Sequence, residues 1–96
     1  MELHTFVRFH AQEGMDEAVA QVMRDAADDV RGEEGCVFIE YHRSVGDPRH
    51  FYIHSCWKDE AAFEVHAELP HTVRFLDHIL PLVDHDLDLT RTRPFI

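Results

Sequence analysis

Histidine is the residue type that gives this sequence most of its capacity for chemistry. The chain of 96 residues contains nine histidines, and an imidazole can change its charge close to neutral pH. His66 and His71 flank Pro70, and in an unbroken helix five residues would place them about 140 degrees apart. A break at Pro70 lets the two side chains converge. We therefore expect His66 and His71 to be catalytic bases; alternatively, His66 is a hydrogen-bonded core residue and His71 caps a helix.

Patterns that hold a metal ion are scarce in the sequence. It has no HExxH motif, and His54 with Cys56 on one strand face offers only two ligands, where zinc requires three or four. Asp84, Asp86 and Asp88 alternate along one predicted strand, but alternate strand residues lie roughly 6.6 Å apart and cannot meet at one ion. We therefore expect no metal site.

Three segments before residue 60 predict β-strands. Residues 3–11, 36–44 and 51–57 are rich in β-branched and aromatic side chains. Gly46, Asp47 and Pro48 separate the second segment from the third, which predicts a β-hairpin. Residues 83–92 alternate apolar and polar side chains and predict a fourth strand with one dry and one wet face.

Helices are predicted between these strands. Residues 15–30 carry apolar side chains at helical spacing over four turns. Asp59 is a suitable N-cap for a short helix that must stop before Pro70, and a second helical stretch runs from Pro70 to about Pro81. The order β-α-β-β-α-β in one domain over residues 1–96 predicts an α+β, ferredoxin-like antiparallel sheet with the helices on one face.

The predicted strands carry apolar side chains on both faces, although the helices can cover only one. Phe6 alternates with Val7 and Phe9, Phe38 with Ile39, and Ile53 with Tyr52. The second face therefore requires another cover, and the same face of a second copy in a homodimer is the simplest one.

Charge and cysteine content limit the partners of the chain. It has 9 Lys+Arg against 19 Asp+Glu, a formal net charge of −10, and its basic residues form no stripe. We therefore expect no nucleic-acid partner. The apolar runs are too short to cross a bilayer, so no membrane partner is expected. Cys36 and Cys56 have no paired spacing and indicate reduced thiols and a cytoplasmic location.

Several short motifs resemble one known family, the antibiotic biosynthesis monooxygenase domain. They follow one another over roughly residues 3–92: Gly35-Cys36-x-x-x-x-Tyr41-His42-Arg43, Asp47-Pro48-x-x-Phe51 and Trp57-x-Asp59-Glu60-Ala61-Ala62-Phe63-x-x-His66-x-x-x-Pro70-His71. The resemblance implies a ferredoxin-like domain that pairs through its sheet into a dimeric α+β barrel. Because a shared fold hosts different reactions, the resemblance is more specific for fold than for chemistry.

The resemblance implies several activities. Some family members oxygenate quinol- or anthrone-type aromatics with molecular oxygen and without a cofactor, whereas others degrade haem or isomerise small phosphorylated sugars. Haem degradation is disfavoured, because the chain has no Asn and has His66 where that branch carries a helical Trp. The anthrone-oxygenating branch resembles this chain at Trp57. Its Asn on the third strand aligns near Ile53 and its helical Tyr near Phe63, so both polar side chains are missing here.

A generic aromatic pocket remains compatible with the sequence. Its expected substrate-binding residues are Trp57, Phe63, Phe75, Tyr41 and His54. Trp57 supplies a surface for stacking, and Tyr41 and His54 lie opposite each other if the hairpin register is as we infer. We therefore expect a cofactor-independent monooxygenase that oxidises a small aromatic with molecular oxygen.

Two other functions remain open. A dimer that binds a small molecule without catalysis accounts for the missing polar partners of the anthrone branch. An isomerase of a small polar metabolite requires Arg8, Arg43 or Arg74 to point into the pocket.

Overall fold

The computed structural model describes residues 1–96 and contains one four-stranded sheet and three α-helices. The elements are, in chain order, β1 (Leu3–His10), α1 (Asp16–Arg31), β2 (Cys36–Arg43), β3 (His50–Trp57), α2 (Glu60–Glu68), α3 (Pro70–Ile79), a short 3₁₀ helix (Leu80–Leu82) and β4 (Asp88–Thr92). No helix is both long and apolar enough to cross a membrane.

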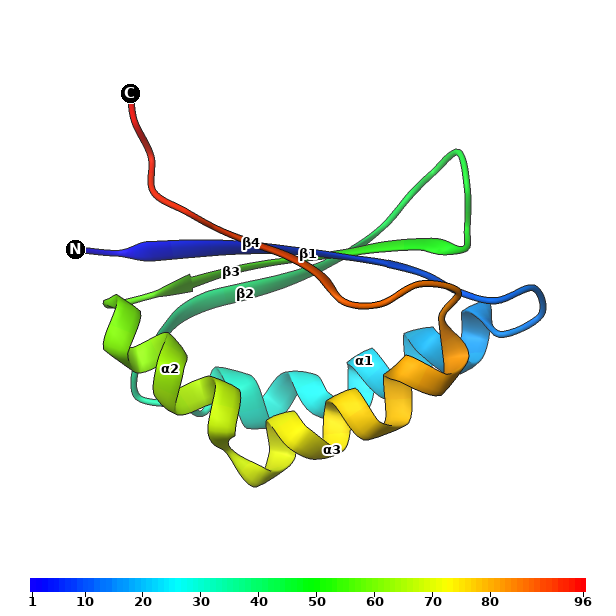
Figure 1. The fold of residues 1–96 in the computed structure, drawn as a ribbon, viewed down its shortest axis with the longest axis horizontal. Helices are drawn as coiled ribbons and strands as arrows, with labels where there is room; N and C mark the ends of the chain where they lie inside the picture. The colour runs from blue at the N-terminus through cyan, green and yellow to red at the C-terminus, as the bar shows by residue number, and fades with distance from the viewer.

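All neighbouring strands are antiparallel, in the order β2-β3-β1-β4. This is the predicted ferredoxin-like arrangement, with α1, α2 and α3 on one side of the sheet (Figure 1). The inward side chains of the sheet form the core, in which Phe9, Trp57 and Ile79 are fully buried. Every second residue of a strand points to the other sheet face, and no helix covers that face (Figure 1).

The predicted helix break between residues 68 and 70 is confirmed. Leu69 is extended, Pro70 begins α3, and the Asp59 carboxylate accepts the predicted capping hydrogen bond from the Ala62 N–H at 2.8 Å. The chain therefore changes direction between α2 and α3.

The last strand is shorter than the alternation of residues 83–92 predicted. β4 begins at Asp88, which pairs with Arg8, and Val83 forms only an isolated bridge with Ala11. Between these two pairs the first segment has two residues, 9–10, and the segment before β4 has four, 84–87. Because the numbers differ, a continuous ladder of paired residues cannot form. The extra residues loop out, and Asp84 is anchored to His10 by its backbone N–H and its side chain.

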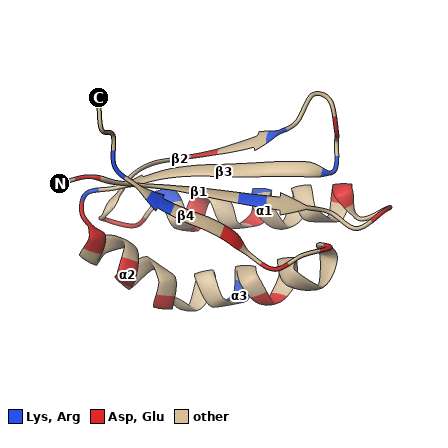
Figure 2. Ribbon diagram, turned by 45° about the horizontal axis from the view of Figure 1, so that its top comes forward, with Lys and Arg blue, Asp and Glu red and all other residues tan.

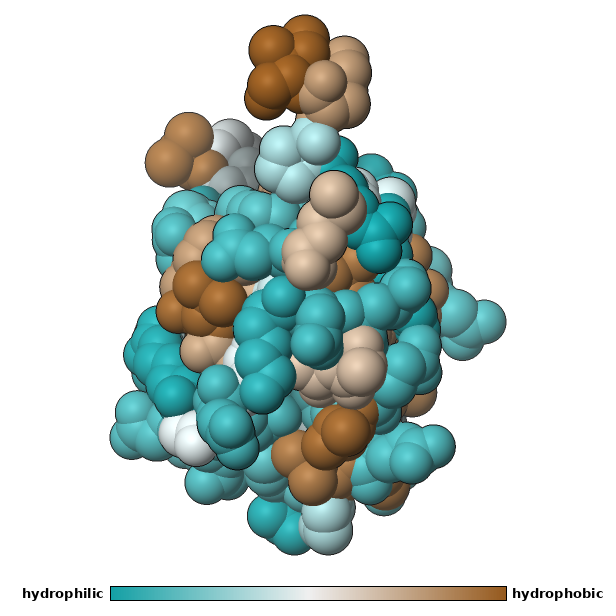
Figure 3. Space-filling model, turned by 90° about the vertical axis from the view of Figure 1, so that its left-hand side faces the viewer, coloured by the Kyte–Doolittle hydropathy of each residue, from teal (hydrophilic) through white to brown (hydrophobic).

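The sheet face without helices is apolar at its centre. Phe6 and Tyr52 expose 47% and 41% of their surface on it, and β3 contains no Lys, Arg, Asp or Glu (Figure 2). Both chain ends lie at the same end of the molecule (Figure 1). There the apolar C-terminal tail, with Phe95 93% exposed, projects beyond the body (Figure 3).

Candidate functional site

The two histidines singled out from the sequence converge on one carboxylate. His66 lies in the last turn of α2 and His71 in the first turn of α3. His66 Nδ1 and His71 Nε2 each lie 2.8 Å from Oε2 of Glu33, and the three side chains are only 15%, 20% and 10% exposed. Because Pro70 interrupts the helix between them, the rings reach the same atom from consecutive helices.

Glu33 reaches the histidines from the turn between α1 and β2. In the same turn Gly35 packs so closely against α2 that an added Cβ would lie 2.5 Å from Cβ of Ala62. The Lys58 N–H also donates to the Gly35 carbonyl at 2.9 Å. The absence of a side chain at Gly35 therefore lets the turn approach α2 closely enough for the Glu33 carboxylate to contact His66.

These contacts define where protons lie on His66. A neutral imidazole that donates its Nδ1–H to the Glu33 carboxylate carries its lone pair on Nε2. No hydrogen bond in the structure involves that Nε2, and no buried side-chain nitrogen or oxygen lacks a partner, so this nitrogen is accessible. The Trp57 ring lies against the imidazole, with 4.4 Å between centroids. His66 is thus oriented with its Nε2 free and with a carboxylate beside its other ring nitrogen.

An apolar cavity of about 140 Å³ lies beside His66, between the sheet and the helices. Thirteen of its 18 lining residues are hydrophobic, and the five others are Thr5, Ser55, His66, His71 and Thr72. Leu87, just before β4, and Leu89, within β4, complete the wall. Such a cavity favours an apolar or aromatic ligand.

The sheet side of the cavity carries a small hydroxyl network. Thr5 and Ser55 face each other across β1 and β3, are almost fully buried, and their hydroxyls are hydrogen-bonded. Trp57 donates its Nε1–H to Ser55 Oγ at 3.0 Å. These groups are satisfied by one another, and they place oxygen atoms within an otherwise apolar wall.

Tyr41 contributes a neutral hydroxyl, not a base, to the cavity wall. Burial raises the pKa of its hydroxyl to about 12, against a smaller opposing effect of the Arg31 guanidinium, which lies 5.8 Å from the ring centroid. The hydroxyl is therefore neutral near pH 7 and can donate a hydrogen bond to a bound oxygen atom.

The sequence model of the family described as antibiotic biosynthesis monooxygenase matches residues 3–77. The chain belongs to the antibiotic biosynthesis monooxygenase family. No curated protein matches it.

Solved structures show how widely this family fold is shared at low sequence identity. Rv0793 from Mycobacterium tuberculosis has a TM-score of 0.93 at 16% sequence identity. The match covers 100% of this chain and 97% of that one. A structure described as antibiotic biosynthesis monooxygenase gives 0.91 at 20% identity, over 98% of this chain and 99% of that one. PA3566 from Pseudomonas aeruginosa has a TM-score of 0.90 at 25% sequence identity, and the match covers 99% of this chain and 95% of that one.

Five of the seven residues predicted to be catalytic or substrate-binding line the cavity. Tyr41, Phe63, Phe75, His66 and His71 all line it. Trp57 is fully buried and does not line the cavity; it supports His66 from behind.

His54 lies on the opposite, helix-free sheet face, and its predicted pairing with Tyr41 is wrong. In the structure Tyr41 pairs with Ile53, and His54 with Glu40. The Ser44 N–H donates to the His50 carbonyl at 2.9 Å where the hairpin closes, which fixes the register one residue away from the inferred one. A shift of one residue moves a side chain to the other face.

Sequence reasoning missed Glu33, Thr5, Ser55 and Thr72. Glu33 stands beside Glu34 in a polar run after the first helix, a pattern that indicates solvent-exposed side chains. No sequence signal separates the two acids, although Glu34 is 94% exposed and Glu33 10% in their side chains. Thr5 and Ser55 alternate with outward residues at the same period as the apolar inward positions, which was an available signal.

None of the arginines required by the isomerase alternative lines the cavity. Arg8 pairs with Asp88 at 2.8 Å, and Arg43 pairs with Asp16 at 2.7 Å. Arg74 is exposed on α3. The cavity therefore lacks the positive charge that a phosphorylated or other anionic metabolite requires.

Proposed function

We propose that this protein is a cofactor-independent monooxygenase that oxidises a single-ring quinol with molecular oxygen. The observation that carries the proposal is His66, which lines an apolar cavity and keeps its Nε2 free while its Nδ1 is held by Glu33. Cofactor-free oxygenation requires a base that turns the substrate into an electron-rich anion, inside a site that excludes water. His66 and the apolar lining meet both requirements.

The reaction is written for hydroquinone as the probe substrate. His66 Nε2 accepts a phenolic proton, and the Glu33 carboxylate stabilises the imidazolium that results. The neutral Tyr41 hydroxyl donates a hydrogen bond to an oxygen of the substrate. Molecular oxygen takes four electrons from the substrate: one atom bonds to a ring carbon, the other leaves as water, and the organic product is a hydroxyquinone.

The size of the cavity supports one ring rather than three. An apolar cavity of roughly 150 Å³ is known to accommodate benzene, and this one has about 140 Å³. An anthrone would have to displace wall residues such as Leu87 or Leu89. We therefore place quinols before anthrones among the substrates of this family member.

We also propose that the protein is a homodimer paired through the helix-free sheet face. The half-exposed Phe6 and Tyr52 and the uncharged strand β3 support this pairing, because exposed apolar patches of this kind mark interaction surfaces. The apolar tail at Phe95 and Ile96, almost fully exposed, supplies further surface for a second copy.

A cytoplasmic location completes the proposal. Cys36 and Cys56 are free thiols, which suits a reducing compartment.

The function is tested by oxygen uptake with chelator-treated protein and a panel of hydroquinones and anthrones. We expect protein-dependent uptake with a hydroquinone and a loss of roughly a hundredfold or more in His66→Ala. His78→Ala, an exposed histidine on α3 outside the cavity, is the matched control and retains the rate. Binding of hydroquinones without uptake would contradict the proposal and support the non-catalytic alternative.

A further inference from the structure

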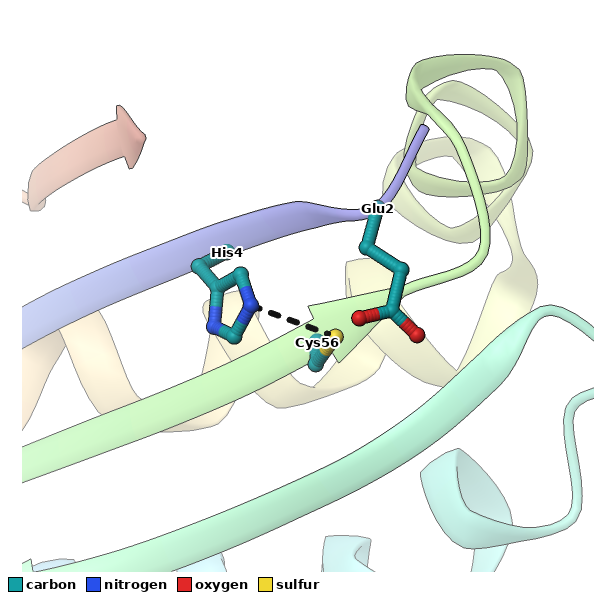
Figure 4. A group of neighbouring side chains, drawn as sticks. All are labelled: Glu2, His4 and Cys56. Carbon is teal, nitrogen blue, oxygen red and sulfur yellow. Dashed lines mark hydrogen bonds between the residues drawn. The ribbon is translucent and has the colours of Figure 1, made fainter. Parts of the chain in front are cut away.

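A second cluster of functional side chains lies on the opposite side of the sheet from the cavity. Glu2, His4 and Cys56 meet where β1 begins and β3 ends (Figure 4). One carboxylate oxygen, one ring nitrogen and the sulfur all lie within 4.8 Å of one another. His4 and Cys56 are direct partners in the β1–β3 register, which holds their side chains next to each other on the same face.

The separation of these atoms fits ligands of a tetrahedral ion. His4 Nε2 lies 3.6 Å from Cys56 Sγ. Ligands about 2.3 Å (sulfur) and 2.0–2.1 Å (nitrogen) from a zinc ion, at a tetrahedral angle, are roughly 3.5–3.6 Å apart. The pair therefore accommodates an ion without a change in its spacing, and the Glu2 carboxylate points toward the same place (Figure 4).

The other ring nitrogen of His4 is also held. His4 Nδ1 lies 2.9 Å from His54 Nε2, and the His54 ring is itself stacked on Phe6 with 4.3 Å between centroids. Histidines that bind a metal commonly have their second nitrogen fixed by a hydrogen bond, which sets the ring orientation. Here that contact turns Nε2 of His4 toward Cys56.

We infer that Glu2, His4 and Cys56 form a zinc-binding site on the helix-free face of the sheet. The Cys56 thiol gives up its proton to solvent as the thiolate–zinc bond forms, and a water molecule completes the four ligands. A thiolate and an imidazole select zinc over magnesium or calcium, which prefer oxygen ligands. The site is separate from the cavity and does not depend on the oxygenase reaction.

Strand pairing brings together more potential ligands at this place than one strand of the sequence offers. The sequence offered His54 and Cys56 from one strand, which are too few, and the expectation of no metal site followed. Pairing of β1 with β3 adds His4 as a ligand and moves His54 to the role of its hydrogen-bond partner. Glu2, just before β1, supplies the third ligand.

Cobalt(II) is the first probe, because a cobalt–thiolate bond gives a charge-transfer absorption in the near ultraviolet that histidine and carboxylate ligands do not give. We expect one equivalent of cobalt per chain to produce this absorption and zinc to remove it. The absorption is lost in Cys56→Ser and retained in Cys36→Ser, which removes the only other thiol. No absorption in the wild type, or absorption that follows Cys36, would overturn the proposal.

Two further variants guard against misfolding of the Cys56 variant. Glu2 is exposed, so Glu2→Gln keeps the fold by circular dichroism and weakens zinc binding at least tenfold in a calorimetric titration. His54→Ala weakens it roughly 10- to 100-fold, the usual effect of losing the partner of a metal-bound histidine. Zinc affinity equal to the wild type in both variants would overturn the assignment of these ligands.

Discussion

Glu33 Oε2 and His66 Nδ1 lie 2.8 Å apart although 33 residues separate them in the sequence. The turn after α1 supplies the carboxylate, and the last turn of α2 supplies the imidazole. This contact fixes which nitrogen of His66 remains free, and in the proposed reaction it places a carboxylate beside the ring that accepts the proton. Glu33 does not itself line the cavity, so its effect on a substrate passes through the histidines.

Glu33→Gln therefore separates turnover from binding. The variant keeps a side chain of the same shape but loses the charge that stabilises protonated His66, so we expect kcat with a hydroquinone to fall roughly a hundredfold while KM stays within about twofold. Steady-state oxygen uptake measures both constants. Glu34→Gln, at the neighbouring exposed acid, is the control and keeps the wild-type kcat. A rise in KM with unchanged kcat would contradict this role of Glu33.

Gly35→Ala tests the close approach that carries Glu33 to the site. An added Cβ would lie 2.5 Å from Cβ of Ala62, so the turn must move away from α2. We expect a loss of roughly 1–3 kcal/mol in the free energy of unfolding together with a lower kcat, measured by urea unfolding and oxygen uptake. Gly46→Ala is the control, because its nearest atom would be Ser44 Oγ at 3.9 Å. Equal stability of the two variants would show that the contact is not tight.

Tyr41→Phe tests the neutral hydroxyl in the cavity wall. Burial raises the pKa of Tyr41 from 10.0 to about 12 in the folded chain. Between these two pH values the folded state retains a proton that the unfolded state loses. The contribution of Tyr41 to the free energy of unfolding is therefore fully present below pH 10 and is lost as the pH rises to about 12. The free energy of unfolding of the wild type, measured with urea, should therefore fall more steeply across this pH range than that of Tyr41→Phe. Parallel pH dependence in the two proteins would contradict the shift.

Phe6→Glu tests the pairing of two helix-free sheet faces. Phe6 lies on this face, half-exposed, and a buried unpaired charge there is strongly unfavourable to association. We expect sedimentation of the wild type at twice the chain mass of 11.2 kDa and of the variant at 11.2 kDa. Val45→Glu, in the fully exposed hairpin loop, keeps the wild-type mass. A wild type that sediments as a single chain would refute the dimer.

The sequence predicted much of the fold because local patterns determine it. Periodicity and the cap at Asp59 located the helices, and Pro70 predicted the break that brings His66 and His71 together. The hairpin register was not predictable at single-residue precision, because the closing loop sets it. Tyr41 therefore pairs with Ile53 instead of His54.

The missed parts of the site depend on contacts between segments distant in the sequence. Glu33 became a partner of His66 only because Gly35 allows its turn to pack on α2. In the same way, His4 and Cys56 are 52 residues apart and meet only through strand pairing. No sequence pattern within a single helix or strand predicts either the Glu33–His66 contact or the His4–Cys56 contact.

The most direct test of the central claim is a turnover of hydroquinone under molecular oxygen labelled with a heavy isotope. The proposed reaction places one labelled atom in the hydroxyquinone and the other in water, and this product is absent from His66→Ala but present with His78→Ala. An organic product without label, or equal labelling with and without His66, would contradict a His66-dependent monooxygenation.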